Sequence, residues 1–103
     1  DVGVLPFPFS HFGGYKKRPS LVIAKSGADD LILCQITSQA IKDSFAVPVS
    51  DSDFESGSLR QMSHVRPNRI FTVDKNIVMY RAAQLKSGKV KQVLEALIRC
   101  ISQ

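Results

Sequence analysis

Residues 21–36, LVIAKSGADDLILCQI, are the stretch that decides the fold. Leu21 to Ala24 is an unbroken apolar run, and Leu31 to Ile36 is a second. Between them, Ser26 to Asp30 holds residues that favour a turn. Short apolar runs bounded by turn residues are typical of strands buried on both faces. We therefore expect two consecutive buried strands joined by a turn.

Four further segments have the short apolar or alternating pattern of strands. Two loops are expected between them, HFGGYKK at 11–17 and SDSDFESGS at 50–58. The second loop lacks the ordered ligand spacing and closing glutamate of a calcium-binding EF-hand, so we interpret it as solvated. The four further strands are expected at Val2 to Phe9, Phe45 to Val49, Ser63 to Asp74 and Ile77 to Ala82.

The C-terminal segment has the periodicity of an amphipathic helix. Its apolar residues recur at the three- and four-residue spacing that places them on one helix face. Ser87 is the expected N-cap. Five or so short strands followed by one helix predict a mainly β fold, a small curved sheet or barrel with the helix packed on it, as one domain over residues 1–103. The apolar stripe consists of Val90, Val93, Leu94, Leu97, Ile98 and Ile101.

The bulk composition favours a basic, soluble protein. The 103 residues carry a formal net charge of +5 with a pI of about 9.5, which favours a polyanionic partner such as nucleic acid or an acidic protein segment. No apolar stretch is long enough to span a bilayer, and the first residues lack the basic region of a signal peptide. Cys34 and Cys100 are too few for a disulfide scaffold and are expected as buried, reduced thiols. These features together favour the cytoplasm.

Several chemistries have no support in the sequence. No phosphate-binding P-loop, dinucleotide glycine pattern or nucleophilic serine elbow is present. His11 and His64 are far apart, and neither has a partner at metal-ligand spacing. We therefore expect no metal and no cofactor.

The remaining candidates are basic and hydroxyl-bearing residues at strand ends. Arg18 begins one expected buried strand, and Thr37 follows the next. If these strands pair antiparallel, the two residues share one rim of the sheet. An arginine beside a hydroxyl is suited to holding a phosphate. The same residues would also fit a basic surface turn beside a strand-terminal threonine.

An ordered set of short motifs resembles a known family. Lys17-Arg18-Pro19 followed by the apolar residues 21–23 is its most specific part. The other parts are Phe7-Pro8-Phe9, Ile36-Thr37-Ser38, Gly57-Ser58-Leu59, Ser63-His64-Val65-Arg66 and Phe71-Thr72-Val73-Asp74. This set, which covers nearly the whole chain, resembles the MazF/PemK family of toxin endoribonucleases from type II toxin–antitoxin systems.

The resemblance implies a fold, an activity and partners. The fold would be an SH3-like barrel with a C-terminal helix, and the protein a cytoplasmic homodimer of a bacterium or archaeon. It would cleave single-stranded mRNA without a metal and so inhibit translation and growth, and a cognate antitoxin would block it. The ribose 2′-hydroxyl would attack the adjacent phosphate, leaving a 2′,3′-cyclic phosphate and a 5′-hydroxyl.

The family's catalytic residues fall on particular positions here. Its arginine matches Arg18, and its threonine or serine matches Thr37, with Ser38 as the alternative if the register shifts by one. Some members also use a loop histidine with an Arg-x-Asp element, which would be His11 and the segment from Arg66.

The chain departs from that last element. Asn68 stands where the family has the aspartate, and asparagine cannot act as a base. His11 has a side chain suited to proton transfer near neutral pH, but it equally fits a solvent-facing loop residue. The general acid and base therefore stay open.

The residues expected to bind RNA surround this candidate site. Phe12 and Tyr15 could stack unpaired bases while lysines follow the phosphates. One of these aromatic rings could instead anchor the loop in the core. For His64, a structural or base-stacking role is expected rather than catalysis. The full RNA-binding set is Phe12, Tyr15, Lys16, Lys17, Ser38, Gln39, His64, Arg66 and Asn68.

Three other functions remain compatible with this sequence. A non-catalytic toxin on the same barrel, similar to the CcdB gyrase poisons, would not need the Arg18 and Thr37 pair. An SH3-like RNA-binding module would bind RNA without cutting it. A degenerate homologue would have lost cleavage together with the acid at position 68.

Overall fold

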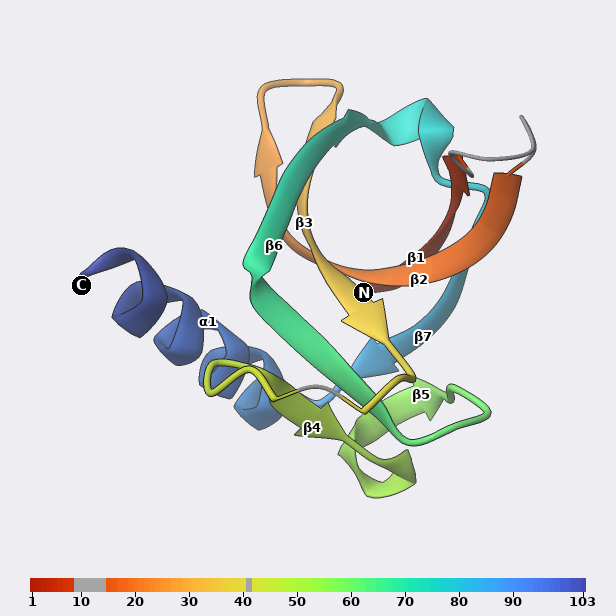
Figure 1. Ribbon diagram of the computed structural model, residues 1–103. Coiled ribbons are helices and arrows are strands. Elements are labelled where there is room, and N and C mark those ends of the chain that lie inside the picture. The colour runs from red at the N-terminus through yellow and green to blue at the C-terminus, as the bar shows by residue number, and fades with distance from the viewer. Residues whose placement is uncertain (9–14, 41) are drawn as a thin grey trace.

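The chain folds as one curled antiparallel sheet with a helix at its end. The computed structural model describes residues 1–8, 15–40 and 42–103. Within them, the strand order is β4-β6-β3-β2-β1-β7-β5. Figure 1 shows that the sheet bends round into a barrel, with α1 outside it. The elements are β1 (Val2–Pro8), β2 (Tyr15–Ser26), β3 (Asp30–Thr37), β4 (Val47–Val49), β5 (Phe54–Gly57), β6 (Ser63–Asp74), β7 (Tyr80–Leu85) and α1 (Ser87–Ile101).

The hairpin of β2 and β3 forms the centre of the sheet, as the apolar runs predict. Leu21 lies opposite Cys34 in the ladder, and both are fully buried. Leu33, the neighbour of Cys34, points to the other face and is also fully buried. Gly27 makes the turn with a φ of 68°, a conformation that favours glycine. The prediction of two buried strands is therefore confirmed.

The core extends from this hairpin to the helix. Val47 of β4 lies opposite Val65 of β6, and both are buried. Val93 and Ala96 of α1 are buried in the same cluster. The predicted mainly β fold with a C-terminal helix packed on it is confirmed.

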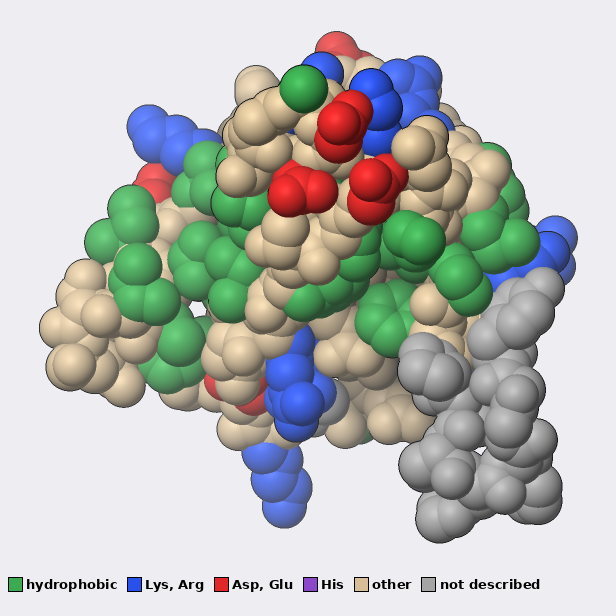
Figure 2. Space-filling model, turned by 90° about the horizontal axis from the view of Figure 1, so that it is seen from above, with side chains coloured by type: hydrophobic (Ala, Val, Ile, Leu, Met, Phe, Trp, Pro, Cys, Tyr) green, Lys and Arg blue, Asp and Glu red, His purple; other side chains and the backbone are tan. Residues whose placement is uncertain are grey.

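The helix differs from its prediction in two details. Ser87 is the first helical residue, and Lys86 is the N-cap without a side-chain hydrogen bond, so the cap was predicted one residue late. Leu94, Ile98 and Ile101 of the predicted stripe are 37%, 59% and 72% exposed. Figure 2 shows hydrophobic side chains on the side of the molecule where α1 lies. No helix in the described ranges is long and apolar enough to cross a membrane.

Two strands in the second half of the chain differ from the predicted ones. The polar segment 50–58, expected as a loop, contains a short 3-10 helix at Asp51–Asp53 and the strand β5. β5 forms because Phe54 is buried and lies opposite Leu85 of β7. β7 begins at Tyr80 rather than Ile77, because Lys75–Ile77 forms a second 3-10 turn after β6.

Gly57 is expected to be intolerant of a side chain. Its φ is 66°, and an added Cβ would lie 2.4 Å from the Ala82 carbonyl oxygen and 2.9 Å from Ala83 Cα. Because both atoms are backbone, the clash can be relieved only by moving β5 away from β7. We expect Gly57→Ala to lower the free energy of unfolding by about 2 kcal/mol or more. Urea unfolding of Gly57→Ala measures the loss. Gly88→Ala in α1, where nothing lies near an added Cβ, is the control and should be neutral or slightly stabilising.

The two cysteines are free thiols in different surroundings. Cys34 is buried in the core, and Cys100 near the end of α1 is half-buried. Burial raises the pKa of the Cys34 thiol to about 11, so it stays protonated at neutral pH. The expected buried, reduced thiol is confirmed for Cys34, whereas Cys100 is only partly buried.

Candidate functional site

The two residues at the centre of the sequence-based hypothesis lie on the same face of the sheet. Ser20 of β2 lies opposite Gln35 of β3 in the antiparallel ladder. Arg18 precedes Ser20 by two residues on β2, and Thr37 follows Gln35 by two residues on β3. Since side chains alternate along a strand, both lie on the face that Ser20 and Gln35 share. The structure therefore brings the guanidinium and the hydroxyl to one end of the β2–β3 pair.

Thr37 also lies opposite a residue of β6, the strand on the other side of β3. In the β3–β6 ladder, Thr37 lies opposite His64, and Gln35 lies opposite Arg66. Side chains directly opposite each other in such a pair have Cβ atoms about 4.5–5.5 Å apart. A row of guanidinium, hydroxyl and imidazole therefore crosses β2, β3 and β6. We call Arg18, Thr37 and His64 the cross-strand row.

The Thr37 hydroxyl oxygen accepts a local hydrogen bond, while its own O–H group is still able to donate one. The backbone amide of Gln39 donates a hydrogen bond of 3.1 Å to Thr37 Oγ1. This local bond turns the chain away from the sheet after β3. Because the oxygen accepts that bond, its own O–H remains able to donate to a ligand oxygen. The side chain of Gln39 is exposed.

A hollow of about 280 Å³ opens beside this strand end. It lies between the start of β2, the end of β3 and the segment that joins β5 to β6. Arg18 contributes to its wall, as does Ser38, the residue predicted as the alternative to Thr37. Thr37 itself is not part of this wall. The lining residues are Lys16, Lys17, Arg18, Pro19, Ile36, Ser38, Leu59, Arg60, Gln61 and Ser63.

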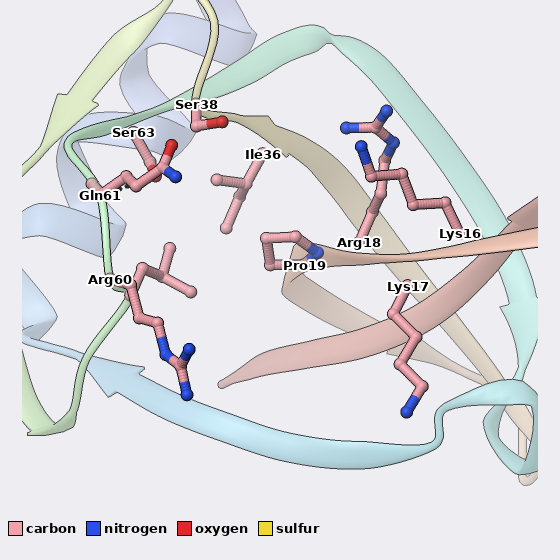
Figure 3. A pocket seen from close by; sticks show the side chains of 10 residues that line it. Lys16, Lys17, Arg18, Pro19, Ile36, Ser38, Arg60, Gln61 and Ser63 are labelled. Atoms are coloured by element: carbon pink, nitrogen blue, oxygen red, sulfur yellow. Dashed lines mark hydrogen bonds between the residues drawn. The ribbon is translucent and has the colours of Figure 1, made fainter.

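The hollow is basic on both sides of β2. Figure 3 shows the side chains of Lys16 and Arg18 on one side of the strand, and the side chain of Lys17 on the other side. These three cations and Arg60 line the hollow without any acidic residue. The salt bridges found among the described residues involve other cations. The charges around the hollow are therefore available to an anionic ligand.

A second hollow of about 430 Å³ continues from the first. The two share Lys17, Pro19, Leu59 and Arg60 in their walls. The second adds Tyr80 and Arg81 of β7 and contains no acidic residue in its wall. Sequence reasoning missed this part of the surface. Only the folded chain shows that residues of β7 and of the segment before β6 line one hollow together with residues of β2.

Arg66 has an acidic partner that the sequence did not suggest. Its Nη2 lies 3.9 Å from Asp43 Oδ2, and both side chains are largely buried. Asp43 is fixed by its other oxygen, which accepts a hydrogen bond of 2.9 Å from the Phe45 amide. No spacing rule connects a residue between β3 and β4 with one on β6. This ion pair could therefore be identified only from the structure.

Asn68 lies in a large bulge of β6. Cys34 pairs with Ile70, but the next residue, Gln35, pairs with Arg66, so three residues of β6 are looped out. The first of them, Pro67, is fully buried, and Asn68 is exposed. The carboxylate that contacts Arg66 thus comes from the β3–β4 connection and not from this position.

Part of the predicted site lies outside the described residues. His11 and Phe12 belong to residues 9–14, which are not described. Tyr15 begins β2, where its backbone pairs with Pro8, but its side chain is not described either. The roles suggested for these three residues stay predictions.

The described residues offer no cluster of metal ligands. No group of three or more His, Cys, Asp or Glu side chains among them is placed to hold an ion. Of the acids in segment 50–58, Asp53 accepts a hydrogen bond of 2.8 Å from the Ser50 amide and lies 3.5 Å from Lys89 Nζ. The hydrogen bond from Ser50 lowers the pKa of Asp53 below its usual value, more than its partial burial raises it.

Comparison with known proteins gives one family match over nearly the whole chain. Residues 1–101 match the family described as PemK-like, MazF-like toxin of type II toxin–antitoxin system. Among curated proteins, none matches the sequence.

Several solved structures have the same fold at low sequence identity. The toxin MazF-mt6 of Mycobacterium tuberculosis is 18% identical with a TM-score of 0.72, over 97% of this chain and 96% of that one. MazF in a MazE–MazF structure from Deinococcus radiodurans is 18% identical with a TM-score of 0.75, over 99% and 92%. An endoribonuclease from a mycobacterial species, solved with its cognate antitoxin, is 13% identical with a TM-score of 0.72, over 97% and 91%.

Proposed function

The chain belongs to the PemK-like, MazF-like toxin family of type II toxin–antitoxin systems, and on this premise we propose that it is a metal-independent endoribonuclease. Its substrate is single-stranded mRNA, which it cuts at selected sequences. The ribose 2′-hydroxyl attacks the neighbouring phosphorus, and the products carry a 2′,3′-cyclic phosphate and a 5′-hydroxyl.

The cross-strand row supports this proposal most strongly. Arg18 and Thr37 share one face at the end of the β2–β3 pair, beside a basic hollow. Negative charge grows on the nonbridging phosphate oxygens in the transition state. A guanidinium can donate two parallel hydrogen bonds to those oxygens, while the threonine hydroxyl holds the phosphate in position. Removing one such donor typically raises the barrier by about 3 kcal/mol.

The remaining predicted residues would bind the RNA strand around that phosphate. Lys16, Lys17 and Ser38 line the same hollow and are placed to contact phosphate and sugar oxygens. Gln39 follows Ser38 in the chain and is exposed, and Asn68 is exposed in the bulge of β6. Arg66 lies two residues after His64 on the same face of β6. We propose base stacking for Phe12 and Tyr15 and retain His11 as a candidate for proton transfer.

The two joined hollows suggest the path of the RNA. Lys17 and Arg60 line both of them, so they mark the point at which a strand would pass from one to the other. Tyr80, which is about half exposed, offers an aromatic face beside Arg81 in the second hollow. Such a combination of cations and an aromatic ring is typical of surfaces that bind single strands.

Replacing Arg60 by alanine is expected to weaken RNA binding without removing catalysis. One lost phosphate contact reduces the slope of log K against log salt by about 0.7 for a single strand. Fluorescence anisotropy with an uncleavable all-deoxy oligonucleotide, titrated at several salt concentrations, measures that slope. Arg99→Ala on the exposed side of α1 removes the same charge elsewhere and should leave the slope unchanged. An equal effect of both variants would contradict this path.

The direct test of the proposed function is a cleavage assay with excess EDTA. The purified chain should cut a long unstructured RNA at discrete sites, because no step needs a metal ion. Mapping the ends should show 2′,3′-cyclic or opened phosphates and 5′-hydroxyls. Retention of cleavage at the same sites after addition of Mg²⁺ is the control. RNA binding without cleavage would indicate a binding module, and a gyrase complex trapped on DNA would indicate a gyrase poison.

The partners follow from the same proposal. The mycobacterial relative was solved with its cognate antitoxin, and the Deinococcus protein as MazE–MazF. We propose that this chain forms a homodimer in the cytoplasm and that, like those relatives, it binds an antitoxin of its own, which inhibits it. Light scattering of the purified chain measures the first of these properties.

A further inference from the structure

His64 has a position that its sequence context did not suggest. In the antiparallel ladders it lies between Thr37 of β3 on one side and Pro48 of β4 on the other. It is half-buried, and its Nδ1 is buried without a hydrogen-bond partner. Most buried polar atoms in proteins are paired, and an unpaired one calls for a functional or structural reason. The other ring nitrogen, Nε2, is the atom left to meet a ligand.

The charged groups around His64 are mostly cationic. Arg66 follows two residues later on the same face of β6, and Arg18 stands beyond Thr37 in the cross-strand row. One acid, Asp43, contacts Arg66. The neighbours on β3 and β4, Thr37 and Pro48, are uncharged. A phosphate held between Arg18 and Thr37 would therefore lie beside an imidazole in a cationic setting.

The other members of the row cannot move a proton efficiently near neutral pH. A guanidinium holds its proton too tightly to donate it near neutral pH, and a threonine hydroxyl is a poor acid and a poor base. Imidazole is the side chain whose ordinary pKa suits this task. Among the described residues, His64 is the one histidine, and it is the direct neighbour of the hydroxyl proposed to hold the phosphate.

We propose that His64 is the general acid of the cleavage reaction, which protonates the departing 5′ oxygen. The proposal rests on the proposed ribonuclease function. The 2′ oxygen forms a bond to phosphorus and releases its proton to water, and the bond from phosphorus to the 5′ oxygen breaks. The imidazolium of His64 gives its proton to that oxygen from Nε2. The neutral ring then takes a proton from solvent, so that the cycle is complete.

The test replaces the leaving oxygen with sulfur at one scissile site. A thiolate is a far better leaving group than an alkoxide and needs no protonation, so a 5′-bridging phosphorothiolate does not require a general acid. His64→Gln should cut the ordinary oligonucleotide about 100-fold or more slowly than the parent chain. On the sulfur substrate the same variant should cut within a few-fold of the parent rate. Arg18→Ala should stay impaired on both substrates, because charge still builds on the phosphate.

The outcomes separate this proposal from the others. An equal loss by His64→Gln on both substrates, or no loss on either, would overturn the assignment. Rescue of His11→Gln by the sulfur substrate, without rescue of His64→Gln, would move the role to His11. A parent chain that cuts neither substrate would refute the ribonuclease function itself and this role with it.

A second measurement covers a His64 variant that fails to fold. In the parent chain, the rate on the oxygen substrate should fall as pH rises, because a general acid must carry its proton to react. That decline should be absent on the sulfur substrate and should persist in His11→Gln. A decline of the same size on both substrates would contradict a general acid in the row.

Discussion

Arg18→Ala is expected to reduce the rate of RNA cleavage by about a hundredfold or more while the chain stays folded. Arg18 is half-buried in the wall of the basic hollow, and its guanidinium is proposed to stabilise the charge that develops on the phosphate. Loss of that donor raises the barrier by about 3 kcal/mol. Because the interaction strengthens in the transition state, kcat should fall more than KM rises. Single-turnover cleavage of a short RNA that contains one mapped site measures the effect.

Two further variants identify the cause of that loss. Arg18→Lys keeps the charge but not the paired donors, so it should recover only a small part of the rate. Lys25→Ala removes a cation from the exposed far end of β2 and should cut at nearly the parent rate. If Arg18→Lys were fully active, general electrostatic attraction rather than a bidentate contact would explain the role of position 18.

Removal of the 2′-hydroxyl at the scissile nucleotide is expected to abolish cleavage at that site completely. The proposed mechanism takes its nucleophile from the substrate, and no described side chain in the cross-strand row can replace it. An oligonucleotide with one deoxynucleotide at the mapped site should remain intact there after times that cut the all-RNA control fully. Denaturing gels of the two labelled strands give the comparison.

Binding must be measured on the same oligonucleotides, since a weakly bound strand would also remain intact. The single substitution should change the dissociation constant by only a few-fold, because most of the affinity comes from phosphate contacts. A cut at the deoxynucleotide would show that water or a protein group attacks the phosphorus, and the 2′-hydroxyl mechanism would then be wrong.

The sequence predicted the parts of the fold that depend on local pattern. The unbroken apolar runs at 21–24 and 31–36 and the periodic helical stripe after residue 87 are local patterns that tertiary contacts only reinforce. β5 was missed because its only buried residue is Phe54, and burial of one side chain leaves no period in a polar segment. The start of β2 at Tyr15 was missed because it is fixed by pairing with β1.

The site was predictable to a similar extent. Arg18 and Thr37 could be brought together by assuming that consecutive strands pair, and the register agrees with that assumption. The proximity of His64 to Thr37 could not be deduced, since it depends on how many residues β6 loops out. Arg60 and Asp43 lie in irregular segments whose position is set by the strands around them.

The looped-out residues of β6 determine which of its side chains reach the candidate site. Leu33, Gln35 and Thr37 share one face of β3. Opposite them, the second half of β6 presents Phe71, which is odd-numbered. The first half of β6 presents His64 and Arg66, which are even-numbered. This change of parity exists because an odd number of residues is accommodated between Arg66 and Ile70. Gain or loss of one residue there would turn the imidazole toward the core and Val65 outward, whereas gain or loss of two would preserve both orientations. Among natural variants of this chain, the number of residues in this segment is therefore expected to change by steps of two.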